Sequence, residues 1–136
     1  MVIEELCVPG FNTTLMGVVR GVASYYGLRA SDAVLYGGSG HAFVINIHKE
    51  LCPSGPYCWD PARFVGLLRN LGLERTDHGF FGAGSSPSAR AAVEEVLRGE
   101  LDRGMPCALL NMEDQLITGY DDTGFLTTQP WAPQLT

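Results

Sequence analysis

Histidine and cysteine side chains in the first half of the sequence are the residue types that bind transition metals. They are His41, His48, Cys52 and Cys58. A strand is expected over residues 42–47, and the odd spacing of the two histidines would point them to opposite faces of it. The cysteine pair lacks the gap of two to four residues that is usual in structural zinc sites. We therefore predict no metal site and no cofactor, and a local disulfide between the two cysteines stays open.

The run Gly37-Gly38-Ser39-Gly40 has the glycine content of a phosphate-binding loop. Such a loop is followed by Lys-Ser/Thr and by the N-terminus of a helix, whose N–H groups bind the phosphate. Here His41 follows, and the next predicted element is a strand. We interpret the run as a tight turn that enters the strand.

Asp121 and Asp122 are adjacent carboxylates that could serve as a general acid and base. They lie in Asp121-Asp122-Thr123-Gly124, between two segments of strand-like composition. Aspartate side chains accept hydrogen bonds from the backbone in turns of this kind. We therefore interpret the pair as turn residues of a hairpin.

The hydrophobic period changes along the chain from helical to strand-like. Apolar residues at helical spacing, with capping residues before them and glycines after them, predict helices over residues 13–26, 31–35, 60–71 and 86–103. Strands are predicted over 42–47, 106–110, 115–120 and 124–128. Helices followed by an antiparallel sheet make the fold class α+β.

Composition limits the partners of the chain. It has 136 residues, 46% of them hydrophobic, which suits a single domain over residues 1–136. The net charge of −6 and the single lysine, Lys49, argue against binding to nucleic acid or to anionic lipid. No apolar stretch approaches the roughly 20 residues of a membrane helix. Glu4 and Glu5 at the start do not fit a signal peptide, so we expect a cytoplasmic location.

A larger combination of motifs carries a resemblance over about residues 8–131. The first helix follows Pro9-Gly10, and the last hairpin reads Leu116-Ile117-Thr118-Gly119-Tyr120-Asp121-Asp122-Thr123-Gly124, with Gln129-Pro130-Trp131 after it. This pattern resembles the papain-like cysteine peptidases that process bacteriocin leader peptides. It is also similar to the N-terminal domain of the butirosin-biosynthesis protein H family, where the segment 36–43 resembles the loop and strand that follow the first two helices. The resemblance implies a papain-like fold.

The same resemblance implies that the catalytic triad is lost. The nucleophilic cysteine of such enzymes sits at the N-terminus of the first helix, where this chain has Phe11-Asn12-Thr13-Thr14. The partner histidine falls on Glu113 or Asp114, and the residue that orients it falls on Gln129. A threonine in this slot, Thr13 or Thr14, attacks only with a base beside it, and Glu113 would be a poor base.

We therefore expect a domain without peptidase activity that binds a peptide or a small polar molecule in the former active-site cleft. The residues expected to line this cleft are Asn12, Thr13, Glu113, Asp114 and Gln129. His41 either faces the same space or packs as a structural histidine. Two alternatives stay open: an acyltransferase or amidohydrolase with a relocated nucleophile, and a regulatory domain of a longer polypeptide.

Overall fold

The computed structural model describes residues 1–45, 47, 49–50 and 61–128. Their contacts form two compact units, and each is described by itself. The first unit combines Met1–Arg29 with Asp77–Thr136, and the second is Ala30–Thr76. The expectation of a single domain stays a prediction.

Helix α1 (Thr14–Tyr25) of the first unit has a defined cap at each end. The Thr13 side chain accepts a hydrogen bond from the backbone N–H of Met16 at 3.3 Å, as expected of an N-cap threonine. At the other end Gly27 adopts a φ of 69°, and the N–H of Leu28 reaches back to the carbonyl of Ala23 at 2.8 Å. This left-handed glycine is the helix stop that the sequence predicts.

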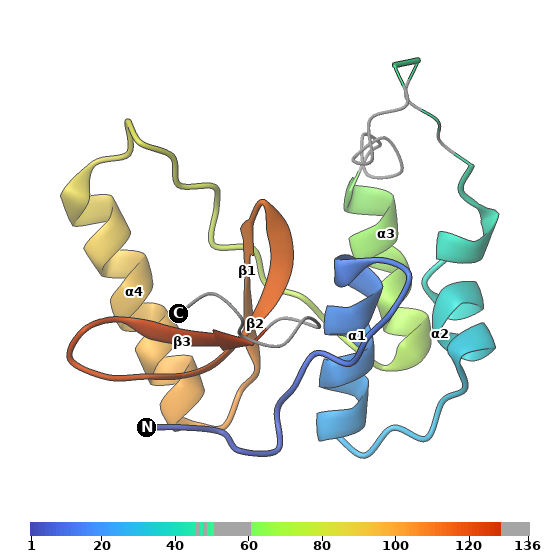
Figure 1. The fold of residues 1–136 in the computed structure, drawn as a ribbon, viewed down its shortest axis with the longest axis horizontal. Coiled ribbons are helices and arrows are strands. Elements are labelled where there is room, and N and C mark those ends of the chain that lie inside the picture. The colour runs from blue at the N-terminus through green and yellow to red at the C-terminus, as the bar shows by residue number, and fades with distance from the viewer. Residues whose placement is uncertain (46, 48, 51–60, 129–136) are drawn as a thin grey trace. The chain divides into compact units, whose positions relative to one another are not determined.

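Three antiparallel strands in the order β1-β2-β3 form the sheet of the first unit, as Figure 1 shows. They are β1 (Cys107–Asn111), β2 (Glu113–Tyr120) and β3 (Phe125–Thr128). All three were predicted from the sequence, with bounds that differ by one or two residues. The expected α+β class is therefore confirmed.

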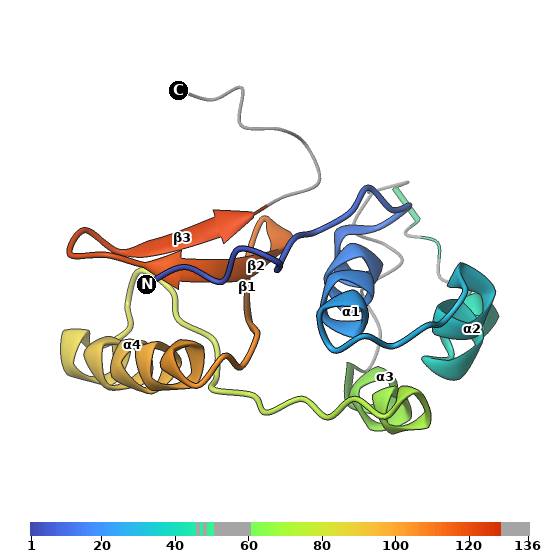
Figure 2. The ribbon, with the colours of Figure 1, turned by 90° about the horizontal axis from the view of Figure 1, so that it is seen from below.

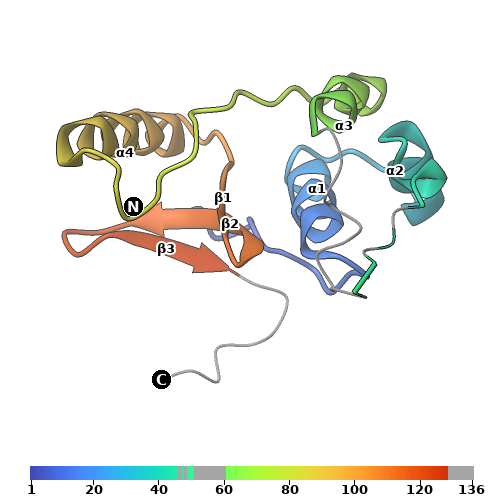
Figure 3. The same cartoon turned by 90° about the horizontal axis from the view of Figure 1, so that it is seen from above.

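Strand β2 is buried on both faces. Consecutive residues of a strand point to opposite sides, so Leu116 and Ile117 have different neighbours. Leu116 packs with Val18 of α1 and with Leu6 and Val8, which precede that helix. Ile117 packs on the other side against Leu101. Leu101 belongs to α4 (Pro87–Asp102), which runs along one face of the sheet in Figures 2 and 3.

The chain before α1 approaches that helix closely at its glycines. A methyl group on Gly17 would lie 2.9 Å from Cγ1 of Val8. A methyl group on Gly21 would overlap the carbonyl oxygen of Cys7 and lie 2.8 Å from Cδ1 of Leu116. Glycines one turn apart on one helix face therefore let the backbone of the preceding segment lie against the helix.

The second unit is helical in its described part. It contains α2 (Asp32–Gly38), the 3-10 helix η1 (His41–Phe43), α3 (Pro61–Leu67) and the 3-10 helix η3 (Leu68–Leu71). Its buried apolar side chains are Leu35, Phe64, Leu68 and Leu71. The third predicted helix is confirmed from Pro61 onward.

Two sequence predictions in this unit are wrong. Gly37 and Gly38 are the last residues of α2, which continues past its predicted end, and do not form a turn into a strand. In the described part of the predicted strand 42–47, Ala42 and Phe43 belong to η1. Phe43 is 81% exposed and Ile45 90% exposed. A strand needs a neighbour for its hydrogen bonds, and within the described residues the strands all lie between residues 107 and 128.

Several predicted features fall outside the described residues. They are His48, the turn between Cys52 and Cys58, Asp60, and the segment Gln129-Pro130-Trp131. Of the helices that the structure describes, none has the length and apolar character needed to cross a membrane.

Gly21→Ala should destabilise the protein by about 1–3 kcal/mol, because its methyl group meets a backbone carbonyl that cannot rotate away. Gly99→Ala is the matched control, since a methyl group there meets nothing within 4 Å inside α4. It should be neutral or should stabilise by up to about 1 kcal/mol. Urea unfolding of both variants measures the difference, and equal stabilities would contradict the close packing at Gly21.

Candidate functional site

The start of α1 meets the start of β2 through the side chain of Thr14. Its hydroxyl donates a hydrogen bond to Oε2 of Glu113 at 2.7 Å. The hydroxyl oxygen of Thr14 also accepts a hydrogen bond from the backbone N–H of Asp114 at 3.2 Å. Thr14 is 9% exposed, so both of its bonds lie largely out of water. One hydroxyl therefore joins two segments about one hundred residues apart in the sequence.

A tight hairpin places Glu113 and Asp114 at this position. Asn111 pairs with Glu113 across the single residue Met112, whose φ is 61°. Gln115 closes the turn from inside by donating its side-chain amide to the carbonyl of Asn111 at 3.2 Å. Few non-glycine residues adopt a positive φ, and the side chain of Met112 is 96% exposed. The turn thus directs Met112 into solvent and leaves the Glu113 carboxylate beside the helix.

The electrostatics of this junction favour a carboxylate. The unpaired N–H groups of the first helical turn carry partial positive charge, and Glu113 lies at that end of α1 through its bond to Thr14. Glu113 itself is exposed. The junction presents hydrogen-bond acceptors at the surface.

The predicted ligand-binding residues are distributed over both units. Asn12 is exposed and directly precedes Thr13, whose hydroxyl is engaged in capping α1. Glu113 and Asp114 both bond to Thr14, a residue absent from the predicted set. The missed signal is the second threonine of Thr13-Thr14, which becomes the first residue of the helix once the first one caps it.

The last two members of the predicted set lie elsewhere. Gln129 is outside the described residues, and His41 belongs to the second unit, in η1. The His41 ring lies 5.5 Å from that of Tyr36 and 6.1 Å from that of Phe64. Burial lowers the pKa of His41 below its ordinary value, so the neutral imidazole is favoured. These contacts match the structural interpretation of this histidine.

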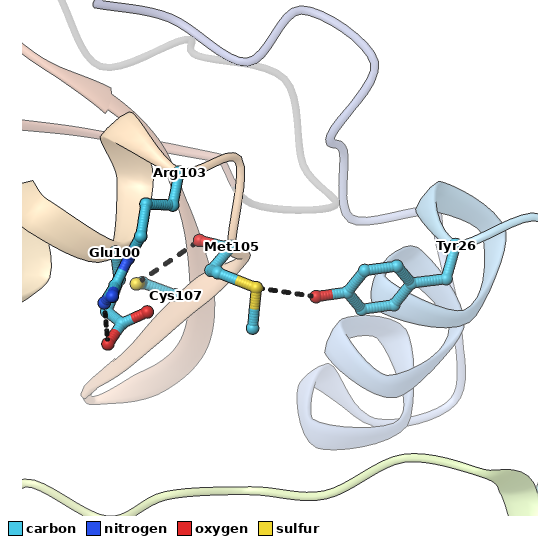
Figure 4. A network of polar contacts seen from close by, with 5 residues as sticks. All are labelled: Tyr26, Glu100, Arg103, Met105 and Cys107. Atoms are coloured by element: carbon cyan, nitrogen blue, oxygen red, sulfur yellow. Dashed lines mark hydrogen bonds and ion pairs between the residues drawn. The ribbon is translucent and has the colours of Figure 1, made fainter.

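A relocated thiol nucleophile does not fit Cys107. Figure 4 shows its sulfur directed at the carbonyl of Met105, 3.6 Å away, in a cluster that also holds Glu100, Arg103 and Tyr26. Burial, with a contribution from the nearby Glu100, raises the pKa of the Cys107 thiol to about 11. The thiolate is the reactive form, so this side chain is inert near neutral pH. Cys7 is a free and exposed thiol that lies before α1 rather than at its start.

Of the two adjacent carboxylates in the last hairpin, Asp121 stabilises the turn. Oδ1 of Asp121 accepts hydrogen bonds from the hydroxyl and the N–H of Thr123, at 2.6 and 2.7 Å, and from the N–H of Gly124 at 3.1 Å. The bonds from Thr123 hold the pKa of Asp121 below its usual value. The prediction of a turn aspartate is confirmed. Arg98 of α4 lies over the rings of Tyr120 and Phe125, which flank the turn, at 4.4 and 5.2 Å.

No cluster of three or more histidine, cysteine, aspartate or glutamate side chains in the described part of the chain is arranged to hold a metal ion. Of the four histidines and cysteines weighed as zinc ligands from the sequence, His48, Cys52 and Cys58 lie outside that part.

Comparison of the chain with models of protein families, with curated proteins and with solved structures finds no match in any of the three.

Replacing Thr14 by valine should destabilise the protein by about 1–3 kcal/mol, because valine keeps the shape but leaves the Asp114 N–H without its acceptor. Thr14→Ser retains the hydroxyl and should recover most of the loss. Urea unfolding followed by circular dichroism gives both values. A valine variant as stable as the wild type would show that the Thr14 hydroxyl does not tie α1 to β2.

The Cys107 thiol makes stability fall at high pH. Its pKa is about 11 in the folded protein and near 9 when unfolded. Below pH 9 the thiol is protonated in both states, and its contribution to the free energy of unfolding does not change with pH. As pH rises from 9 to 11, the unfolded state loses this proton first, and the free energy of unfolding falls by at most about 3 kcal/mol. Unfolding of wild type and Cys107→Ala across this range isolates the effect, because the tyrosines and other thiols titrate in both. Parallel curves for the two proteins would contradict the raised pKa.

Proposed function

We propose that the chain is a papain-like domain that has lost cysteine-peptidase chemistry and binds a peptide or a small polar molecule at the junction of α1 and β2. The contact of Thr14 with Glu113 and Asp114 carries this proposal. The resemblance assigns the nucleophile to the start of the first helix and its histidine to Glu113 or Asp114. In the structure those two segments are joined by hydrogen bonds, which supports the assignment of the slots.

The side chains at this junction cannot perform thiol chemistry. Asn12, Thr13 and Thr14 occupy the positions around the helix start where a cysteine would stand. The partner of the hydroxyl is a carboxylate, which is a weak base for an alcohol. Loss of both the thiol and the imidazole removes the ion pair that activates such enzymes. The proposed domain is therefore a binding module.

The ligand class follows from the groups that the junction exposes. The Asn12 amide offers one donor pair and one acceptor, and the Glu113 carboxylate offers acceptors only. Peptide N–H groups, hydroxyls and amines satisfy such a surface. The net charge of −6 makes a nucleic acid an unfavourable partner. A reducing, cytoplasmic setting is part of the proposal, and the free thiols of Cys7 and Cys107 are compatible with it.

A second candidate function is acyl transfer or amide hydrolysis with Thr14 as the nucleophile. The 2.7 Å bond to Glu113 has the length of a nucleophile–base contact. The burial of Thr14 opposes this function, because an acyl carbonyl must reach the hydroxyl oxygen. Binding without turnover is the better supported function.

Restoring a thiol and an imidazole tests the assignment of the slots. In Thr14→Cys/Glu113→His the two groups should replace the hydrogen-bonded pair, and the imidazolium should lower the pKa of the new thiol. At pH 6.5 iodoacetamide should therefore label this cysteine at least about tenfold faster than in Thr14→Cys alone. Peptide-level mass spectrometry separates the label on residue 14 from labels on the natural cysteines.

Thr13→Cys/Glu113→His is the matched control, since the Thr13 side chain faces the helix backbone rather than Glu113. It should show no acceleration. Equal labelling rates in Thr14→Cys and in the Thr14→Cys/Glu113→His double variant would contradict the assignment of the slots. Modification of Thr14 in the wild type by a fluorophosphonate probe, abolished by Glu113→Gln, would instead establish the second function.

A further inference from the structure

A recess lies between the first turns of α4 and the turn that precedes the helix. Its volume is about 360 Å³, and it is lined by Ala83, Ser85, Pro87, Arg90, Ala91 and Glu94. None of these residues takes part in the junction of α1 and β2. The uncharged lining residues are small, so Arg90 and Glu94 determine which ligands the recess favours.

Hydrogen bonds hold the wall of this recess in place. The N–H of Ser85 donates to the carbonyl of Gly82 at 3.1 Å, and the N–H of Gly82 donates to the Ser85 hydroxyl at 3.0 Å. Arg90 donates from one terminal nitrogen to the same Gly82 carbonyl at 3.0 Å. Ser86 caps α4 by accepting from the N–H of Ala89 at 3.1 Å. The turn and the helix are thus fixed to each other before any ligand arrives.

The two charged side chains of the recess do not neutralise each other. Arg90 and Glu94 are four residues apart on α4, a spacing that places them on the same helix face. Their charged atoms lie farther apart than an ion pair allows, and Arg90 is directed to the Gly82 carbonyl instead. Within the described part of the chain, Glu94 makes no hydrogen bond or ion pair. A guanidinium with spare donors and an unpaired carboxylate, both exposed, therefore border one open recess at the surface.

We propose that this recess binds a small zwitterion, specifically a free α-amino acid. Its carboxylate would pair with Arg90, because a guanidinium presents a fork of donors that matches a carboxylate. Its ammonium group would pair with Glu94. Ala83, Pro87 and Ala91 leave room for an apolar side chain, and the volume lies at the low end of the range for small-molecule sites. This site is independent of the function proposed at α1.

Nuclear magnetic resonance titration of the ¹⁵N-labelled protein tests the proposal on the ligand side. L-Leucine should shift the backbone amide signals of residues 83–94 in a saturable manner. N-acetyl-L-leucine lacks the ammonium group and L-leucine amide lacks the carboxylate, so each should bind at least about tenfold more weakly. Equal binding of the three compounds would overturn the proposal. So would the absence of saturable shifts up to about 50 mM leucine.

Variants test the same proposal on the protein side. Glu94→Gln removes a charge that has no partner in the folded protein, so the fold should persist while leucine affinity falls at least about tenfold. Glu95→Gln, on the same helix but outside the recess, should bind leucine like the wild type. Unchanged affinity in Glu94→Gln would overturn the proposal. Leucine-dependent shifts confined to residues 12–14 and 113–114 would also overturn it, and would place the ligand at the junction of α1 and β2.

Discussion

The burial of β2 on both faces is the constraint on which the first unit depends. Leu116 and Ile117 are both fully buried and point to opposite sides of the strand. One side must be covered by α1 with the segment before it, and the other by α4. With α1 fixed against Leu116, its first residue reaches the first residues of β2. The contact of Thr14 with Glu113 follows from this packing and does not require a separate positioning element.

This arrangement brings two chain segments together without the side chains that peptidase chemistry needs. The start of a helix beside the start of a strand is a setting in which a thiol and an imidazole would activate each other. Threonine and glutamate in the same setting form a stable hydrogen bond with little nucleophilic character. The junction therefore combines a largely buried bond at Thr14 with exposed polar groups at Asn12 and Glu113. The proposed binding function rests on this combination.

Local signals account for most of the secondary structure that the sequence predicts correctly. Thr13 and Ser86 cap their helices, and Gly27 and Gly72 end theirs with positive φ values of 69° and 73°. Each of these roles depends on a few neighbouring residues. The turn at Asp121 is local in the same sense, because its carboxylate binds donors two and three residues away.

Failures arise where the structure depends on distant partners. The segment 42–47 has the composition of a buried strand, yet its described residues find no neighbouring strand, and Phe43 and Ile45 are exposed. Gly37 and Gly38 continue a helix that their low propensity argues against. At the site, the sequence expectation that the helix start lies beside the strand start rests on the resemblance. Which threonine makes the contact depends on which one caps the helix: Thr13 is the cap, so Thr14 contacts β2. The binding role of Asn12, Thr13, Glu113 and Asp114 stays a prediction.

The central claim is that the Thr14 hydroxyl and the Glu113 carboxylate interact directly and so join α1 to β2. A double-mutant cycle of Thr14→Val and Glu113→Ala, followed by urea unfolding, measures that interaction apart from all others. We expect the sum of the two single losses to exceed the loss in the double variant, with a coupling free energy of about 0.5–1.5 kcal/mol. Strictly additive losses would contradict this claim, because they would mean that the two side chains contribute to stability independently.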